Sequence, residues 1–184
     1  RSHHCRIARN NLVRGATTHN GYGGYVSLGG SSDNLVTGNW IEGTFGIQVS
    51  VGADHNVIED NLISDSGLGL ILFGASDNRI IENRIERTEF GLGIFGLIDP
   101  ASSFNLPADR NIIEANTIRG GLYGIGTWRT SGNRFLDNEI LDHWIGLYEG
   151  PVGPFDTQPN SYSENSIAGN RLFGLLVIGG SPLL

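Results

Sequence analysis

The sequence predicts an all-β fold, a parallel β-helix in which short strands are wound into stacked coils. The first observation is a repeat of 22 residues marked by two asparagines five positions apart, as in Asn34 and Asn39. The second is a branched apolar residue two positions after each asparagine, as in Val36 and Ile41. The third is that apolar and polar or small residues alternate, which is the period of a strand and not of a helix. Strands this short can pair only with the same strands of the next copy, so we expect three parallel sheets.

About seven copies can be aligned on their asparagine pairs, and each copy predicts one coil. A degenerate first copy starts at Cys5 and Asn10. The later copies start at Asn34/Asn39, Asn56/Asn61, Asn78/Asn83, Asn111/Asn116, Asn133/Asn138 and Asn165/Asn170. The spacing of 33 residues from Asn78 to Asn111 and of 32 from Asn133 to Asn165 places one insertion in the fourth copy and another in the sixth. Both insertions follow the third strand of their copy, so we expect them at one edge of one sheet.

Two apolar columns result from this alignment and form the predicted core. The first column is Ile7, Val36, Ile58, Ile80, Ile113, Phe135 and Ile167, and the second is Leu12, Ile41, Ile63, Ile85, Ile118, Ile140 and Leu172. Asparagine suits the turns between strands because it tolerates left-handed backbone angles and its amide bonds nearby backbone groups. Stacked amides can also bond from coil to coil. We therefore interpret the asparagines as scaffold residues.

One stretch carries a family resemblance. It reads Asn56-Val57-Ile58-Glu59-Asp60-Asn61-Leu62-Ile63 and then Gly69-Leu70-Ile71-Leu72. This pattern resembles the right-handed parallel β-helix superfamily with its pectate-lyase-like fold. The nearest likeness is to repeats of NosD-like periplasmic proteins and of carbohydrate-binding and sugar-hydrolase proteins. The resemblance implies a right-handed helix over almost the whole chain, and it leaves the function open because this scaffold carries several chemistries. A leucine-rich repeat has a similar period, but its L-x-x-L-x-L core is present only in fragments.

Composition limits the organisation of the protein and its partners. A chain of 184 residues is long enough for one β-helix domain over residues 1–184, and the absence of methionine suggests a processed product or a piece of something longer. The net charge of −7 argues against a nucleic-acid partner. The single cysteine excludes an internal disulfide, and no apolar run is long enough to span a membrane. With the resemblance, we expect a secreted, periplasmic or cell-surface protein.

The third strand of each copy predicts an aromatic and apolar outer face. If Ile47 and Val49 face the core, Gln48 and Ser50 face out. The same alternation puts these residues on that face: Tyr25, Ser27, Ile71, Phe73, Phe95, Trp128, Tyr148, Leu176 and Ile178. Three interpretations are open. The aromatic rings stack on sugars of a polymer, the face is a protein interface, or the insertions fold over it as a second core. The predicted carbohydrate-binding residues are Tyr25, Phe73, Phe95, Trp128 and Tyr148.

No complete catalytic set can be assembled, so enzymatic activity stays uncertain. Lyases and epimerases of the resembled fold need a base and a group that neutralises a carboxylate. The Asp-Pro-His element of the alginate-epimerase type is reduced here to Asp99-Pro100-Ala101. Hydrolases need two carboxylates near each other. The residues from which an enzyme would draw its chemistry are Asp99, Arg129, Glu149 and Asp156, with His143 or Tyr148 as the proton carrier.

We expect no cofactor, and calcium is the metal kept as an alternative. A calcium site needs converging carboxylates, and the sequence has no Asp-x-Asp cluster. NosD-like relatives are associated with copper delivery, but one cysteine and no methionine leave few soft ligands.

The function best supported by the sequence is that of a non-catalytic module that binds an extracellular carbohydrate polymer. The alternatives are a structural scaffold subunit of a larger assembly, and a polysaccharide lyase, epimerase or hydrolase. A protein partner would bind at the apolar face or at the two open ends of the solenoid, where strand edges are unpaired.

Overall fold

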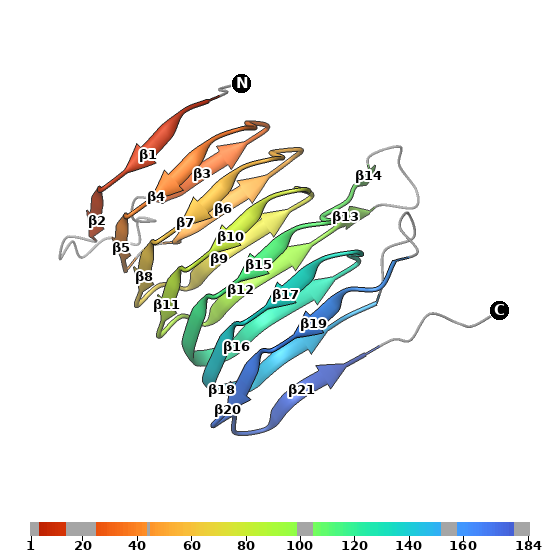
Figure 1. The fold of residues 1–184 in the computed structure, drawn as a ribbon. Coiled ribbons are helices and arrows are strands. Elements are labelled where there is room, and N and C mark those ends of the chain that lie inside the picture. The colour runs from red at the N-terminus through yellow and green to blue at the C-terminus, as the bar shows by residue number, and fades with distance from the viewer. Residues whose placement is uncertain (1–3, 14–24, 44, 99–104, 152–157, 179–184) are drawn as a thin grey trace.

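A computed structural model describes residues 4–13, 25–43, 45–98, 105–151 and 158–178. In these residues the chain forms β-strands only, wound into stacked coils with the first and last described strands at opposite ends of the stack (Figure 1). Every strand pair is parallel except one hairpin, β13 (Leu97–Ile98) with β14 (Asn105–Leu106), in the insertion of the fourth coil. No helix capable of crossing a membrane is found in this part of the chain. The predicted parallel β-helix is confirmed.

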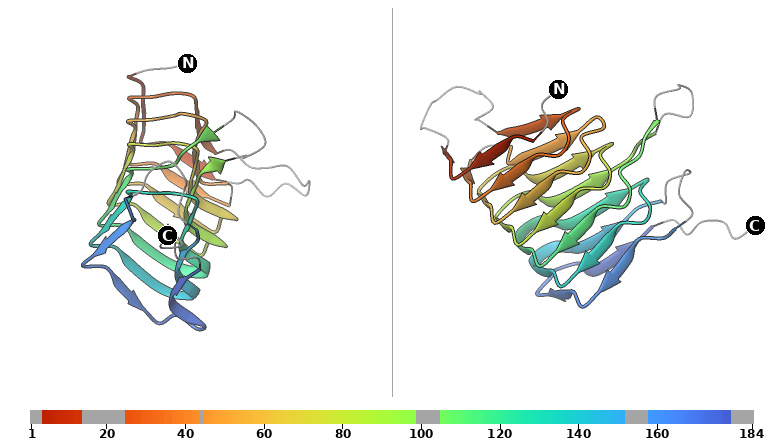
Figure 2. Two further views of the ribbon diagram at one scale, coloured as in Figure 1. Left: turned by 90° about the vertical axis from the view of Figure 1, so that its right-hand side faces the viewer. Right: turned by 45° about the horizontal axis from the view of Figure 1, so that its top comes forward.

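Each coil contributes one strand to each of three stacks (Figure 2). The first stack contains β1 (Arg6–Ala8), β4 (Leu35–Thr37), β7 (Val57–Glu59), β10 (Arg79–Ile81), β15 (Ile112–Glu114), β17 (Arg134–Leu136) and β19 (Ser161–Ser163). The second contains β2 (Asn11–Val13), β5 (Trp40–Glu42), β8 (Leu62–Ser64), β11 (Arg84–Glu86), the start of β16 (Thr117–Trp128), the start of β18 (Glu139–Glu149) and β20 (Ser166–Ala168). The third contains β3 (Val26–Gly29), β6 (Ile47–Ser50), β9 (Leu68–Phe73), β12 (Phe90–Phe95), the ends of β16 and β18, and β21 (Phe173–Val177). Because β16 and β18 continue through a corner, the second and third stacks are one 12-stranded sheet.

The core consists of identical positions lying over one another. In the second stack Ile41, Ile63, Ile85, Ile118 and Ile140 are paired from coil to coil and completely buried. Burying an isoleucine side chain stabilises the fold by about 1.5 to 3 kcal/mol, so this position adds a similar stabilisation with each further coil. The 22-residue period therefore determines which residues pair between successive coils, and the repetition of this pairing builds the solenoid.

Two asparagine ladders run along the core. The Oδ1 of Asn61 accepts hydrogen bonds from the backbone N–H of Asn39 at 3.0 Å and from its Nδ2 at 2.8 Å. The Nδ2 of Asn61 donates to the carbonyls of Val36 and Glu59 as well as to the Oδ1 of Asn83. One ladder contains Cys5, Asn34, Asn56, Asn78, Asn111, Asn133 and Asn160, and the other contains Asn10, Asn39, Asn61, Asn83, Asn116, Asn138 and Asn165. The interpretation of the asparagines as scaffold is confirmed.

The left-handed backbone position is occupied by the residue before most of the ladder asparagines, not by the asparagine itself. Asp60, Glu82, Ala115 and Asp137 precede second-ladder asparagines with φ between 53° and 54°. The expectation that asparagine adopts the left-handed turn was therefore wrong. Its contribution is the amide side chain, which joins successive coils, while the strained turn accepts several residue types because the stacked hydrogen bonds hold it.

The alignment of the last coil is corrected by the structure. Asn160, and not Asn165, bonds Asn133, so this coil begins 27 residues after Asn133 instead of 32. Asn165 belongs to the second ladder, and Asn170 occupies the third corner, where its Oδ1 accepts from the N–H of His143 at 2.9 Å. All three asparagines are five residues apart, so spacing alone fits two different registers.

The same shift moves two residues out of their predicted core columns. Ile167 pairs with Ile140 in the second stack, and Tyr162 takes the place above Phe135. The rings of Phe135 and Tyr162 stack with centroids 4.8 Å apart. Leu172, predicted to lie in the core, is 58% exposed.

Candidate functional site

The third stack carries the predicted aromatic residues on its outer surface. Strand pairing aligns Phe73, Phe95 and Trp128 in one row, and places Tyr148 opposite Gly126 in the next row. Tyr25 lies at the other end of the stack, just before β3. Trp128 and Tyr25 are 39% and 46% exposed, and the other three are half-buried. Four aromatic residues therefore lie together on coils three to six.

Glycines allow some of these rings to lie flat on the sheet. A Cβ at Gly93 would overlap the ring of Phe95, and one at Gly150 would lie 2.6 Å from the Cε3 of Trp128. Each ring thus rests on backbone that bears no side chain. The planes of Trp128 and Tyr148 differ by only 9°, with centroids 6.3 Å apart.

Two residues predicted to face outward are buried. Ile71 is 2% exposed and Ser50 is 7% exposed. A Cβ at Gly93 would meet both Phe95 and the Cδ1 of Ile71, so the large ring covers its smaller neighbour. Alternation placed both residues among the outward positions, but it does not account for the size of adjacent side chains.

A further pair of aromatic residues extends this surface. Phe90 and Tyr123 are paired between β12 and β16, and their rings stack with centroids 4.7 Å apart. Tyr123 also meets Tyr148 edge to face at 6.3 Å. A sequence signal for this row exists, because a bulky residue immediately precedes the glycine of the third strand in Phe45, Leu68, Phe90, Tyr123, Ile145 and Phe173. We call Phe73, Phe90, Phe95, Tyr123, Trp128 and Tyr148 the aromatic face.

The described members of the candidate catalytic set lie in two places, with His143 at a corner of its coil and Arg129, Tyr148 and Glu149 at the neighbouring ends of β16 and β18. His143 and Glu149 lie six residues apart on β18, which is about 20 Å along a strand. Glu149 is paired with the buried Thr127, and its Oε1 accepts from the Nδ2 of Asn160 at 3.2 Å. Arg129 follows β16, and its N–H donates to the carbonyl of Pro151 at 2.7 Å. Asp99 and Asp156 lie outside the described residues.

His143 is a core residue at the third corner of its coil. It is completely buried and paired with Gly121 of the preceding coil. Burial lowers the pKa of its imidazole to about 4, and the nearby carboxylate of Asp142 offsets this only in part. The ring is therefore neutral at pH 7. A group sealed in the core has no access to a substrate on the surface, so the geometry does not favour His143 as a proton carrier.

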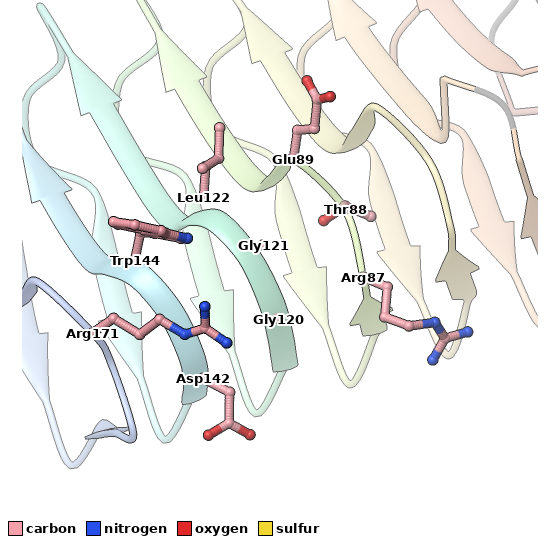
Figure 3. Close-up of a pocket in the computed structure, with 9 residues that line it drawn as sticks. All are labelled: Arg87, Thr88, Glu89, Gly120, Gly121, Leu122, Asp142, Trp144 and Arg171. Carbon is pink, nitrogen blue, oxygen red and sulfur yellow. The ribbon is translucent and has the colours of Figure 1, made fainter.

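A second site, not predicted from the sequence, lies at the corner between the second and third stacks (Figure 3). Its volume is about 460 Å³. We call it the corner pocket, and it is lined by Arg87, Thr88, Glu89, Gly120, Gly121, Leu122, Asp142, Trp144 and Arg171. The guanidinium carbon of Arg171 lies 6.0 Å from the centre of the Trp144 ring. These residues come from four successive coils, so no single sequence motif predicts the pocket.

Metal ligands are not clustered in the part of the chain that the structure describes. It contains no group of three histidine, cysteine, aspartate or glutamate residues able to hold an ion. Several aspartates instead pair with arginines of the neighbouring coil, as Asp65 does with Arg87 and Asp77 with Arg110. Cys5 is exposed at the N-terminal end of the first ladder. The expected calcium alternative gains no support from these residues.

Comparison with known protein families matches residues 2–99 to the family described as "Periplasmic copper-binding protein (NosD)". Comparison with curated protein sequences finds no match. Among solved structures, a similar chain is that of trypsin-treated QnrB1, a plasmid-mediated fluoroquinolone resistance protein. The two are 12% identical over 95% of this chain and 91% of that chain, with a TM-score of 0.18.

Proposed function

Because the chain belongs to the NosD family of periplasmic copper-binding proteins, we propose that it is a periplasmic β-helix protein that binds a carbohydrate polymer on its aromatic face without catalysing a reaction. The observation that carries this proposal is the row of aromatic rings supported by bare glycine backbone. The finer elements of the proposal, the ligand class and the absence of catalysis, rest on the arguments that follow.

The geometry of the rings suits sugars better than it suits a smooth apolar contact. The π-face of an aromatic ring is electron-rich, and it attracts the polarised C–H groups on one side of a pyranose. Trp128 rests on Gly150 with its plane nearly parallel to that of Tyr148, so the two rings form a shallow platform. Phe73 and Phe95 stack on each other, with centroids 5.3 Å apart, and extend the aromatic surface on the preceding coils. Repeated platforms along a solenoid suit a repeating ligand.

The absence of catalysis is supported by the surroundings of the ionisable residues. His143 is sealed in the core, and Glu149 lies beside the buried Thr127 and bonds Asn160. The outer surface beside the aromatic face offers tyrosines, and burial raises the pKa of Tyr148, so its hydroxyl stays protonated near neutral pH and is not available as a base. A polymer held on this face would meet binding groups without a paired acid and base.

Copper, which the family name implies, does not fit the described residues. Copper sites use soft sulfur ligands or several imidazoles at converging positions. Here the sequence has no methionine, the described residues contain no group of three possible ligands, and His143 is buried away from the surface. We therefore assign no role to copper in the part of the protein that the structure describes.

Affinity gel electrophoresis tests the proposal directly. The protein is run through gels containing single neutral or acidic polysaccharides, together with Trp128→Ala and the matched control Trp40→Ala. Trp40 is similarly exposed, but it lies on β5 in the second stack, away from the aromatic face. We expect retardation by at least one polymer, loss of it in Trp128→Ala and no change in Trp40→Ala. Absence of retardation by every polymer would overturn the proposal.

The alternative of a scaffold subunit uses the same surface differently. A contiguous apolar face is also a common docking surface for another protein. Native mass measurement separates the two functions, because a scaffold subunit forms a stable complex while a polymer-binding module does not require one. A lone monomer that binds polysaccharide through Trp128 supports the proposed function.

A further inference from the structure

We propose that the corner pocket is a separate binding site for a single neutral pyranose unit, such as a chain end or a side branch of a glycan. None of the residues of the aromatic face lines this pocket. The features that favour a sugar are the shape of the pocket floor, two exposed apolar side chains and the balance of charge around the rim.

The floor of the pocket is bare backbone. Gly120 and Gly121 have φ values of 72° and 142°, which residues with a side chain rarely adopt. A Cβ at Gly121 would overlap the carbonyl oxygen of Thr88 on the preceding coil, so no side chain can occupy this place. The β16 strand therefore passes the corner without filling it, and a hollow remains between Thr88 and Trp144.

The walls offer apolar surface that the fold leaves partly exposed. Trp144 and Leu122 are 49% and 44% exposed, and both line the pocket. Figure 3 shows the indole of Trp144 beside the glycine corner, with Leu122 projecting on the far side of it from Arg171. An exposed tryptophan next to a bare backbone floor is suited to a flat ring with one apolar face.

The charges around the rim favour a neutral ligand. Arg87 binds Asp65 through both carboxylate oxygens, at 2.8 and 2.6 Å, and Arg119 binds Asp142 at 2.9 Å. Arg171 and Glu89 remain, and neither has an ion-pair partner among the residues that the structure describes. One free cation and one free anion leave no net charge for attracting an acid. The net charge of −7 of the whole chain also disfavours anions near its surface.

Glu89 and Arg171 line the pocket from different coils, together with Leu122 and Trp144 (Figure 3). A pyranose has an apolar body surrounded by hydroxyls, and planar charged groups such as Arg171 and Glu89 bond pairs of hydroxyls well. The volume of about 460 Å³ is within the range of small-molecule sites.

The test is binding of methyl β-D-glucopyranoside, methyl β-D-galactopyranoside and methyl α-D-mannopyranoside, followed by protein NMR. Methyl β-D-glucuronoside is the acidic comparator. We expect saturable binding of at least one neutral glycoside and a loss of about tenfold or more in affinity in Trp144→Ala. Arg171→Ala and Glu89→Ala should each weaken binding, while Trp40→Ala should leave it unchanged. Urea midpoints show that each variant is folded.

A second measurement reports on the pocket alone. The double variant W40F/W128F leaves Trp144 as the only tryptophan, so ligand contact changes its fluorescence directly. Because W128F alters the aromatic face, binding retained in this variant separates the pocket from the proposed polymer site. The inference is overturned if no neutral glycoside binds, if Trp144→Ala binds as well as the parent, or if the glucuronoside binds about tenfold tighter than every neutral glycoside.

Discussion

Replacing Asn83 by alanine tests the asparagine ladder at its centre. The Oδ1 of Asn83 accepts from the N–H and the Nδ2 of Asn61, at 3.1 and 2.9 Å. Its Nδ2 donates to the carbonyls of Ile58 and Ile81 and to the Oδ1 of Asn116, at 2.9, 3.0 and 3.0 Å. Asn83→Ala removes all five bonds in a place that water does not reach, because Asn83 is 1% exposed.

The size of the destabilisation in Asn83→Ala follows from the polar groups that are left without hydrogen-bond partners. The buried N–H of Asn61 loses its acceptor and the carbonyl of Ile58 loses a donor, and each unpaired buried group costs about 1 to 3 kcal/mol. With the cavity left by the amide, we expect the free energy of unfolding to fall by about 3 to 6 kcal/mol. This is a large fraction of the stability of an ordinary domain, about 5 to 15 kcal/mol.

Equilibrium unfolding in urea, followed by circular dichroism, measures the loss. The matched control is Asn165→Ala in the same ladder, at the partly exposed end of the solenoid. Water can replace its bonds there, so we expect a loss of about 1 kcal/mol. Equal losses in the two variants, or a loss below about 1 kcal/mol in Asn83→Ala, would refute the claim that buried amides hold the coils together.

Three further predictions concern the corners of the coils. The pKa of His143 is lowered to about 4 in the fold, below its ordinary 6.5, so the unfolded chain takes up the proton first. Stability is therefore full above pH 6.5 and falls by up to about 3 kcal/mol as the pH drops towards 4, and urea midpoints should show that His143→Leu lacks this part of the pH dependence. Gly121→Ala should destabilise by about 2 kcal/mol or more, since its φ and its close contact exclude a Cβ, whereas Gly126→Ala, whose Cβ meets nothing within 4 Å, should leave the urea midpoint nearly unchanged. Asp65→Asn breaks an exposed ion pair with Arg87 and should not shift the thermal midpoint measurably, and a clear shift would contradict the screening argument.

The repeat predicted the architecture from the sequence alone because every copy carries the apolar and asparagine positions that pair with the next coil. Ile58 and Ile80 are 22 residues apart and lie in register on neighbouring strands. Their burial, the two asparagine ladders and the outward direction of Phe73, Phe95 and Trp128 all follow from the period and from strand alternation. Such properties need only local pattern and one stacking rule.

Other features depended on contacts that no local pattern records. The register of the last coil was decided by which of Asn160 and Asn165 reaches Asn133, because a spacing of five residues fits both. The burial of Ile71 was decided by the ring of Phe95, which leans over Gly93 from the same strand. Side-chain size and direction at neighbouring positions set these outcomes, and they become visible only when the coils are packed.

The corner pocket is the clearest feature that depends on packing and not on the repeat. Glu89, Leu122, Trp144 and Arg171 each belong to a different coil, and they meet because β12, β16 and β18 are paired in register and β21 follows. The sequence by itself determined a stacked solenoid with an aromatic outer face, since both arise from a short repeated pattern. Only the tertiary structure decided where its free charges and bare glycines come together, because that meeting depends on corners whose residues differ from one copy to the next.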